Sequence, residues 1–364
     1  MPLDKKNNKA PSIYFIVPAP TGISPGQRFR FEQYCSFLKE KNISFTISSF
    51  YSLSAWQVLY TSTSKTKKIL AVLTGFLKRV ADLFKVWHYS YVYVYREAAP
   101  VGPPFFEWFI AKILRKKIIY DFDDAIWIPF KSEYNHAASG LKSFGKVAKI
   151  CRWSYKISVG NQFLATYAEK YNSNVYIIPT VVDTEAVHNN LQDQQTQTPS
   201  IGWTGTFSTL KYLDLILPAL QRLQVCYDFI FFVIADKDPH LPLKNYRFIK
   251  WIRNNEVADL LHFHIGLMPL LDDEISKGKC GFKAIQYMSL GLPSVVSPVG
   301  VNTEIVEDGV NGFICHTLND WEEKLSLLLM NTPLRIAMGK TARDKIKSKY
   351  SVKATEDLFL KLFN

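Results

Sequence analysis

The sequence predicts an α/β protein built from two doubly wound parallel-sheet domains. The chain has 364 residues, of which 48% are apolar, which is enough for two cores at roughly 150 residues per domain. Short apolar runs alternate with helical patterns of ten or more residues, as in parallel sheets. This alternation stops at a polar, Gln-rich stretch, residues 189–199, and restarts after it. Two such domains are expected to face each other across a cleft, where small ligands usually bind.

In the N-terminal half, the first apolar run is followed by a Pro- and Gly-rich loop and then by a helical pattern over residues 29–41. A second helical pattern ends at Leu114. The strands expected in this half cover residues 12–17, 43–50, 91–95, 117–120 and 176–179.

In the C-terminal half, helices are expected over residues 210–223 and 283–289, and a last helix over 352–363. The expected strands cover residues 200–203, 229–235, 264–268 and 294–297. The predicted organisation is an N-terminal domain over residues 1–184, a linker over 185–199, a C-terminal domain over 200–348, and a helix over 349–364 that packs back on the N-terminal domain.

Cysteine content and hydropathy indicate a cytoplasmic protein. The five cysteines are odd in number and contain no C-x-x-C pair, which argues against a disulfide framework or a cysteine-rich zinc site. The first apolar run is stopped by Pro18, so no signal peptide is visible. No run reaches the roughly 18 apolar residues that a membrane-spanning helix needs.

Positive charge is confined to one half of the chain. Residues 1–180 hold 25 Lys and Arg against 11 Asp and Glu, whereas residues 181–364 hold 19 against 21. This asymmetry predicts that the N-terminal domain faces an anionic partner: a membrane surface, an acidic substrate or nucleic acid.

Residues 65–87 form an amphipathic helical pattern. Seven apolar residues recur at helical spacing, and six Lys or Arg accompany a single acid, Asp82. The apolar stripe comprises Ile69, Leu73, Phe76, Val80, Leu83, Phe84 and Trp87. The simplest interpretation is a face packed on the domain core. The alternative is contact with an anionic membrane, which would place the protein peripherally on the inner face of that membrane.

The strongest candidate for a binding site lies between Lys277 and Gly312. A loop that contains Lys279 and Gly281 opens into the helix that carries Lys283 and Gln286. Free backbone N–H groups at a helix start favour an anion, glycine lets the backbone approach it, and lysines add charge suited to a diphosphate. The alternative is a βα loop with solvated lysines.

Two segments of the N-terminal half are further candidates. Arg28 and Arg30 follow the first strand and could bind phosphate or lie on a solvated helix face. Asp121, Asp123 and Asp124 lie at a strand end and imitate a metal-binding D-x-D, although an ion pair with Arg96 is equally compatible with the sequence.

The C-terminal half resembles the group 1 glycosyltransferases, often called family 4. The segment QYMSLGLPSVVS with GVNTEIVEDGVNG is similar to the family's C-terminal signature over about 35 residues. IPTVVD at 178–183 and GTFSTLK at 205–211 agree with its pattern. The resemblance implies the two-Rossmann GT-B fold, a nucleotide-sugar donor, retention of anomeric configuration and no required metal or other cofactor.

By position, Lys211 matches the family lysine that contacts the donor diphosphate. Gln286 stands at the position of the second glutamate of the family's E-x7-E motif, which holds the ribose. Thr206 stands where the family has an arginine, and Gly278 where it has the first glutamate. Lys279 or Lys283 would supply the missing positive charge. Asp123 falls where many relatives have a histidine near the transferred sugar.

The sequence therefore predicts a glycosyltransferase with Asp123 and Lys211 as catalytic residues. Arg28, Thr206, Lys279, Gly281, Lys283 and Gln286 are expected to bind the donor. The acceptor is expected to be a glycan or a lipid-linked molecule. The alternative is a sugar-nucleotide-binding protein without catalysis. A nucleic-acid-binding protein is disfavoured, because no recognised nucleic-acid-binding motif accompanies the basic charge.

Overall fold

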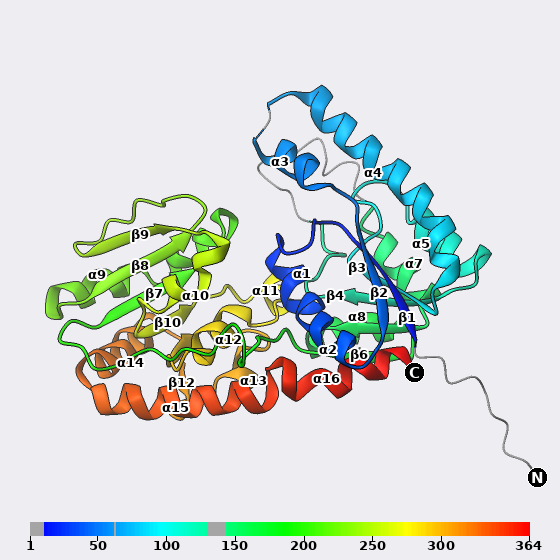
Figure 1. The fold of residues 1–364 in the computed structure, drawn as a ribbon. Coiled ribbons are helices and arrows are strands. Elements are labelled where there is room, and N and C mark those ends of the chain that lie inside the picture. The colour runs from blue at the N-terminus through cyan, green and yellow to red at the C-terminus, as the bar shows by residue number, and fades with distance from the viewer. Residues whose placement is uncertain (1–10, 62, 130–142) are drawn as a thin grey trace, which may run out of the picture. The chain divides into compact units, whose positions relative to one another are not determined.

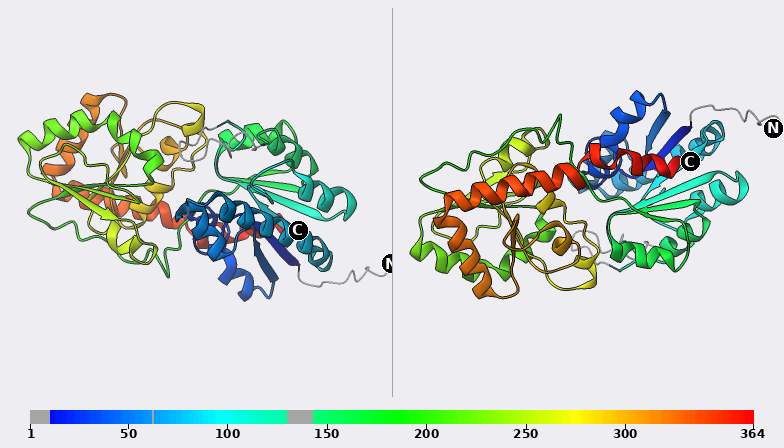
Figure 2. Two further views of the ribbon diagram at one scale, coloured as in Figure 1. Left: turned by 90° about the horizontal axis from the view of Figure 1, so that it is seen from above. Right: turned by 90° about the horizontal axis from the view of Figure 1, so that it is seen from below.

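A computed structural model describes residues 11–61, 63–129 and 143–364 of the chain. The described chain forms two compact units. The N-terminal unit comprises Met1–Pro179 with Glu356–Asn364, and the C-terminal unit comprises Thr180–Thr355. Each unit contains one six-stranded parallel sheet with helices on its faces, which confirms the predicted fold class (Figures 1 and 2). No helix among the described residues is both long enough and apolar enough to cross a bilayer.

The sheet of the N-terminal unit has the strand order β2-β1-β3-β4-β5-β6. Its strands are β1 (Ser12–Val17), β2 (Ser44–Ser49), β3 (Tyr91–Tyr95), β4 (Lys117–Phe122), β5 (Lys156–Val159) and β6 (Val175–Ile177). Parallel strands covered on both faces read as nearly continuous apolar runs, which is why β3 is written YVYVY and is buried along its whole length.

Helices of three to 21 residues cover the sheet of the N-terminal unit. They are α1 (Pro25–Arg30), η1 (Glu32–Tyr34), α2 (Cys35–Glu40), α3 (Leu53–Thr61), α4 (Lys65–Lys85), η2 (Val86–His88), α5 (Phe105–Trp108), the π-helical η3 (Phe109–Ile113), α7 (Lys146–Trp153) and α8 (Gln162–Glu169). The end of α16 (Val352–Leu360) and η6 (Lys361–Phe363) also belong to this unit, where the Phe359 ring stacks on Tyr34 with 4.1 Å between centroids.

The prediction that the apolar stripe of α4 faces the core is wrong for most of the stripe and holds only for Phe76 and Leu83, which are half-buried. The buried residues of this helix are Ala71, Gly75, Arg79 and Asp82, whereas Phe84 is 77% exposed and Leu73 is 54% exposed. The small side chain of Gly75 is required there, because a Cβ would lie 2.2 Å from the Phe50 ring.

A buried polar network fastens α4 to the sheet, in addition to the packing of the Phe76 ring on Phe50 and Phe106. Arg79 donates to the carbonyl oxygens of Val17 at 2.7 Å and Ala98 at 2.6 Å and pairs with Asp82 at 2.7 Å. Asp82 also accepts from the hydroxyls of Tyr14 and Ser48, each at 2.7 Å. Because every charge in this network has a partner, the helix can turn its polar residues inward and leave the apolar ones outside.

The sheet of the C-terminal unit has the order β12-β11-β10-β7-β8-β9. Its strands are β7 (Ser200–Thr204), β8 (Ile230–Ala235), β9 (Tyr246–Lys250), β10 (Ile265–Met268), β11 (Ser294–Val296) and β12 (Gly312–Ile314). Its helices are η4 (Phe207–Leu215), α9 (Leu217–Cys226), η5 (Arg253–Asn255), α10 (Glu256–Leu260), α11 (Glu274–Lys277), α12 (Phe282–Ser289), α13 (Asn302–Ile305), α14 (Leu318–Met330) and α15 (Thr332–Lys349).

Several elements differ from those expected. The helix expected over residues 29–41 is divided into α1, η1 and α2, and the one over 210–223 is divided into η4 and α9, which has a proline in its first turn. Strands β5, β9 and β12 were not expected. Two of these lie at the sheet edge, and all have five residues or fewer, so each contributes little apolar signal.

The Gln-rich stretch packs on the C-terminal unit. Gln194 is buried, and its amide donates to the His264 carbonyl at 3.2 Å and accepts from Arg335 at 3.3 Å. A glutamine at this position can therefore satisfy backbone and side-chain groups at once.

Candidate functional site

Three parallel strands of the C-terminal unit end at one edge of its sheet. After β7, β10 and β11 the chain enters loops and helix starts that contain all the site residues predicted for this half. Ligands of doubly wound sheets bind at this carboxyl edge.

The first of these loops is stabilised by local capping. Thr206 and Thr209 form a capping box at the start of η4, in which the Thr206 N–H donates to the Thr209 hydroxyl at 3.1 Å. The side chain of Thr206 therefore caps the start of η4. It does not supply the positive charge of the arginine expected at this position. Its neighbour Gly205 leaves no space for a side chain, because a Cβ would lie 2.3 Å from the Trp203 ring.

Two lysines from different loops reach the same aromatic ring. The ammonium of Lys211 lies 5.5 Å from the centre of the Tyr212 ring, and that of Lys279 lies 5.8 Å from it. The Tyr212 hydroxyl is 3.2 Å from the Ser276 hydroxyl, which ties η4 to α11. The Tyr212 ring therefore interacts with two positive charges at this edge.

A third lysine completes the group. Lys283, in the first turn of α12, places its ammonium 4.9 Å from the centre of the Trp203 ring. Burial and, to a smaller extent, the positive charge of Lys279 together lower the pKa of Lys283 to about 7. An anion bound beside these lysines would offset both effects and restore the proton.

The remaining lysine of the loop is neutralised by its neighbours. Lys277 pairs with Asp272 at 3.4 Å and Glu274 at 3.3 Å. Lys211, Lys279 and Lys283 all lie at this edge, and we call them the lysine group.

Two glycines shape the backbone around the lysine group. Gly281 precedes α12 with φ of +65°, and a Cβ there would lie 2.1 Å from Ile305. Gly300 has φ of +55°, and a Cβ there would lie 3.0 Å from the carbonyl oxygen of Lys277. Both positions combine a left-handed conformation with close packing, so only glycine fits them without strain.

Gln286 lies one turn after Lys283 and is 3% exposed. Its amide nitrogen has no hydrogen-bond partner among the described residues, and neither has the indole nitrogen of Trp203. An unsatisfied buried amide costs about 1–3 kcal/mol, so an apolar residue would be more stable here. Unpaired polar groups beside a cationic group are typical of a site that awaits a ligand with hydroxyls.

In the N-terminal unit, Asp123 is a buried carboxylate with strong partners. It accepts hydrogen bonds from the Tyr95 hydroxyl and from Arg96 Nε, both at 2.9 Å, and Arg96 also pairs with Asp124. Burial raises the pKa of Asp123, but the Arg96 and Arg30 guanidiniums outweigh it and hold this pKa below its ordinary value. Asp123 is therefore an anion in an ion pair.

The two arginines of α1 that the sequence offered as phosphate ligands, Arg28 and Arg30, differ in burial and in their contacts. Arg30 is buried and pairs with Asp121 at 2.5 Å, so it has a structural position rather than the phosphate-binding one considered from the sequence. Arg28 is half-buried on α1, with its guanidinium 4.8 Å from the centre of the Phe29 ring. All three aspartates of the D-x-D-like segment, Asp121, Asp123 and Asp124, are thus engaged by arginine. Within the described residues, no group of three or more His, Cys, Asp or Glu side chains has a metal-holding arrangement.

The structure brings six of the eight predicted site residues to one sheet edge: Thr206, Lys211, Lys279, Gly281, Lys283 and Gln286. Asp123 and Arg28 belong to the other unit. Sequence reasoning missed the aromatic rings of Trp203 and Tyr212, which hold the lysines. For Trp203, the available sequence signal was the position of a tryptophan at the end of a predicted buried strand.

Comparisons with known proteins cover the segment that contains these six residues. Residues 198–331 match the family model described as glycosyl transferases group 1. No curated protein matches the sequence.

Solved structures match along nearly the whole chain. A glycosyltransferase from Rickettsia africae ESF-5 is 14% identical with a TM-score of 0.68, and the match covers 98% of each chain. Sucrose-phosphate synthase from Thermosynechococcus elongatus is 12% identical with a TM-score of 0.73, covering 98% of this chain and 99% of that one. HepE from Anabaena, solved in complex with UDP-glucose, is 13% identical with a TM-score of 0.63, covering 97% and 99%.

The solved structures share the two-domain GT-B fold with this chain. Residues 198–331, which lie in the C-terminal unit, match the group 1 glycosyl transferases, in agreement with the resemblance seen in the sequence.

Proposed function

We propose that this protein transfers a sugar from a nucleoside diphosphate-sugar to a glycan or lipid-linked acceptor. The observation that carries the proposal is the lysine group at the carboxyl edge of the C-terminal sheet, inside the segment that matches the group 1 family. The UDP-glucose complex of HepE, a protein of the same fold, supports a nucleotide-sugar as the donor.

The lysine group would bind the donor diphosphate and stabilise the negative charge that develops on it as the sugar departs. Lys279 and Lys283 supply the charge that the family's arginine would provide at the position of Thr206. The amide of Gln286 both donates and accepts hydrogen bonds, so it suits the hydroxyls of a ribose. The left-handed conformation of Gly281 begins α12, whose first backbone N–H groups would contact the phosphates.

Transfer with retention and without a metal ion is also part of the proposal. The lysine group would supply the positive charge at the diphosphate that a metal ion could otherwise provide. The carboxylates of Asp121, Asp123 and Asp124 form ion pairs with arginine side chains of the protein. Asp123 would act at the reacting sugar or the acceptor hydroxyl, where a permanently ionised carboxylate can stabilise developing positive charge.

The N-terminal unit would hold the acceptor and associate peripherally with the inner face of a membrane. The support is the outward face of α4, where Leu77 is 70% exposed and Phe84 is 77% exposed. Exposed apolar residues in a row on a basic helix are typical of helices that lie in a membrane interface.

The test is transfer of a radiolabelled sugar from a panel of nucleoside diphosphate-sugars to a bacterial glycolipid extract, with and without EDTA. We expect a labelled lipid or glycan product with one donor, unaffected by EDTA and lost in Lys211→Ala. Donor binding with no product would assign the chain to the non-catalytic alternative. Loss of product with EDTA and recovery with Mn²⁺ would contradict metal independence.

A further inference from the structure

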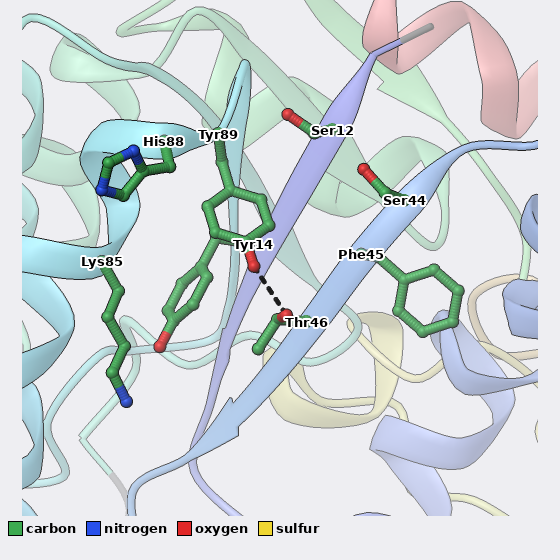
Figure 3. A pocket seen from close by; sticks show the side chains of 8 residues that line it. All are labelled: Ser12, Tyr14, Ser44, Phe45, Thr46, Lys85, His88 and Tyr89. Carbon is green, nitrogen blue, oxygen red and sulfur yellow. Dashed lines mark hydrogen bonds between the residues drawn. The ribbon is translucent and has the colours of Figure 1, made fainter.

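A cavity of about 580 Å³ opens at the amino-terminal edge of the N-terminal sheet, on the opposite side from the strand ends at Asp121. The starts of β1 and β2, the end of α4 and the turn after it form its walls (Figure 3). Its lining residues are Ser12, Tyr14, Ser44, Phe45, Thr46, Lys85, His88 and Tyr89. Ligand sites in proteins commonly have volumes of about 300–1,000 Å³.

The lining is rich in groups that can donate hydrogen bonds to an anion. It combines the ammonium of Lys85 and the imidazole of His88 with hydroxyls from both strands. The hydroxyls of Thr46 and Tyr89 are 2.7 Å apart, so one of them already presents an ordered oxygen to the cavity (Figure 3). Phosphate oxygens accept hydrogen bonds from donors of each of these kinds.

The charges around the cavity also favour an anion. Lys116 lies against its wall, where its ammonium donates to the Tyr89 carbonyl at 3.0 Å. The nearby acid, Asp82, is buried behind Tyr14 and is neutralised by Arg79 at 2.7 Å. The uncompensated charge facing the cavity is therefore positive.

The cavity lies at one end of the exposed apolar face of α4. Lys85 is the last residue of this helix, and the flanking side chains Phe84 and Trp87 are 77% and 61% exposed. The apolar face continues toward the start of the helix through Val80, Leu77, Leu73, Leu70 and Ile69. A membrane interface offers apolar chains to such a face and headgroups at its border.

We infer that this cavity binds the phosphate headgroup of an anionic lipid while the apolar face of α4 enters the interface. The inference rests on the proposed peripheral association and adds a specific lipid site to it. Lys85 and His88 would contact the phosphate, and the hydroxyls of the two strands would contact the rest of the headgroup. The site is separate from the lysine group, which belongs to the other unit.

The experiment compares Lys85→Gln/His88→Gln with Lys67→Gln, a matched control that removes one charge near the other end of α4. Full-length protein is co-sedimented at low salt with phosphatidylcholine vesicles, with and without 30% phosphatidylglycerol. Wild type should bind only the anionic vesicles. Lys67→Gln should lower the affinity about fivefold, as for any one basic residue near the surface. The double variant should lower it by about 150-fold or more, beyond the roughly 25-fold expected if two basic residues contributed surface attraction alone, because charged hydrogen bonds are lost as well.

A loss of about 25-fold or less in the double variant, as for two basic residues that act through surface attraction alone, would overturn the headgroup site and leave peripheral association standing. Absence of wild-type binding to anionic vesicles would overturn the proposed association and the site with it. Soluble glycerol phosphate distinguishes the source of the phosphate. Competition at micromolar concentration would show a site for a free phosphate ester and overturn the lipid assignment, whereas failure to compete supports a headgroup presented by a bilayer.

Discussion

The ammonium of Lys283 lies 4.9 Å from the centre of the Trp203 ring, in surroundings that lower its pKa to about 7. A lysine with this pKa is only partly charged at neutral pH. Its protonation is therefore coupled to whatever anion binds at the carboxyl edge of β7 and β10.

Donor binding should depend on pH through Lys283. Below pH 7 the ammonium is already present in the free protein, so affinity should be independent of pH. Above pH 7 binding must take up a proton, because the diphosphate favours the charged form and raises the pKa of this lysine. Affinity should then fall by up to about tenfold per pH unit. Calorimetry at pH 8 in two buffers of different ionisation enthalpy should show uptake of up to one proton.

Lys283→Arg is the control for this coupling, since arginine stays charged. The variant should bind without proton uptake at pH 8. Proton uptake that persists in the variant would assign the coupling to another group.

Gln286→Leu should separate stability from binding. The amide nitrogen of Gln286 has no partner among the described residues, so its loss should leave thermal stability unchanged or raise it. Donor affinity should fall because the ribose contact is lost. Calorimetric titration and thermal unfolding measure both effects.

Gln224→Leu is the matched control. The side chain of Gln224 donates to the Asn245 carbonyl at 3.1 Å and accepts from the Lys244 N–H at 2.7 Å. Its replacement should destabilise the fold by about 1–3 kcal/mol with no change in donor affinity. If Gln286→Leu behaves like Gln224→Leu, the amide of Gln286 is structural.

Asp123→Asn should lower kcat more than it weakens donor binding, because its proposed role is at the reacting centre. Asp124→Asn is a close control, since Asp124 pairs with the same Arg96 but its side chain is 43% exposed. We expect a loss of at least about tenfold in kcat for the first variant and little change for the second. Equal losses of kcat in the two variants would mean that Asp123 only positions Arg96.

Leu77→Ser/Phe84→Ser should weaken binding to anionic vesicles without unfolding the protein, because both side chains are largely exposed. Each buried apolar side chain contributes about 1.5–3 kcal/mol in a membrane interface. Val225→Ser, at an 86% exposed position on α9, should have no effect on sedimentation. Binding that survives Leu77→Ser/Phe84→Ser would exclude α4 from the contact.

The sheets could be predicted, and the candidate residues of the C-terminal half could be placed at one sheet edge, because their signals are local. Buried parallel strands are continuous apolar runs in the sequence, as in β3 and β8. The glycines and lysines around Gly281 follow one another closely in the sequence, so an anion-binding loop can be predicted from that segment alone. The short edge strands β9 and β12 contribute too few apolar residues to be seen.

The orientation of α4 could not be predicted, because it depends on distant residues. Hydrophobic periodicity identifies the apolar face of a helix but not the face that packs. Arg79 and Asp82 turn inward because Val17, Ser48 and Tyr14 provide partners far away in the sequence. The pairing of Asp123 with Arg96 was an open alternative for the same reason, and a left-handed turn at Arg96, with φ of +59°, accompanies it.

The most direct test of the lysine group is a thermal-shift panel of nucleoside diphosphates and their sugar esters, on wild type and Lys211→Ala. At 100 times its dissociation constant, a true donor should stabilise the wild type by about 2.7 kcal/mol. Lys211→Ala should need about 10-fold or more additional ligand for the same shift, because a charged hydrogen bond to phosphate is worth about 1.5–3 kcal/mol. A panel in which no diphosphate stabilises the wild type, or in which the variant responds equally, would contradict the assignment of this edge as the donor site.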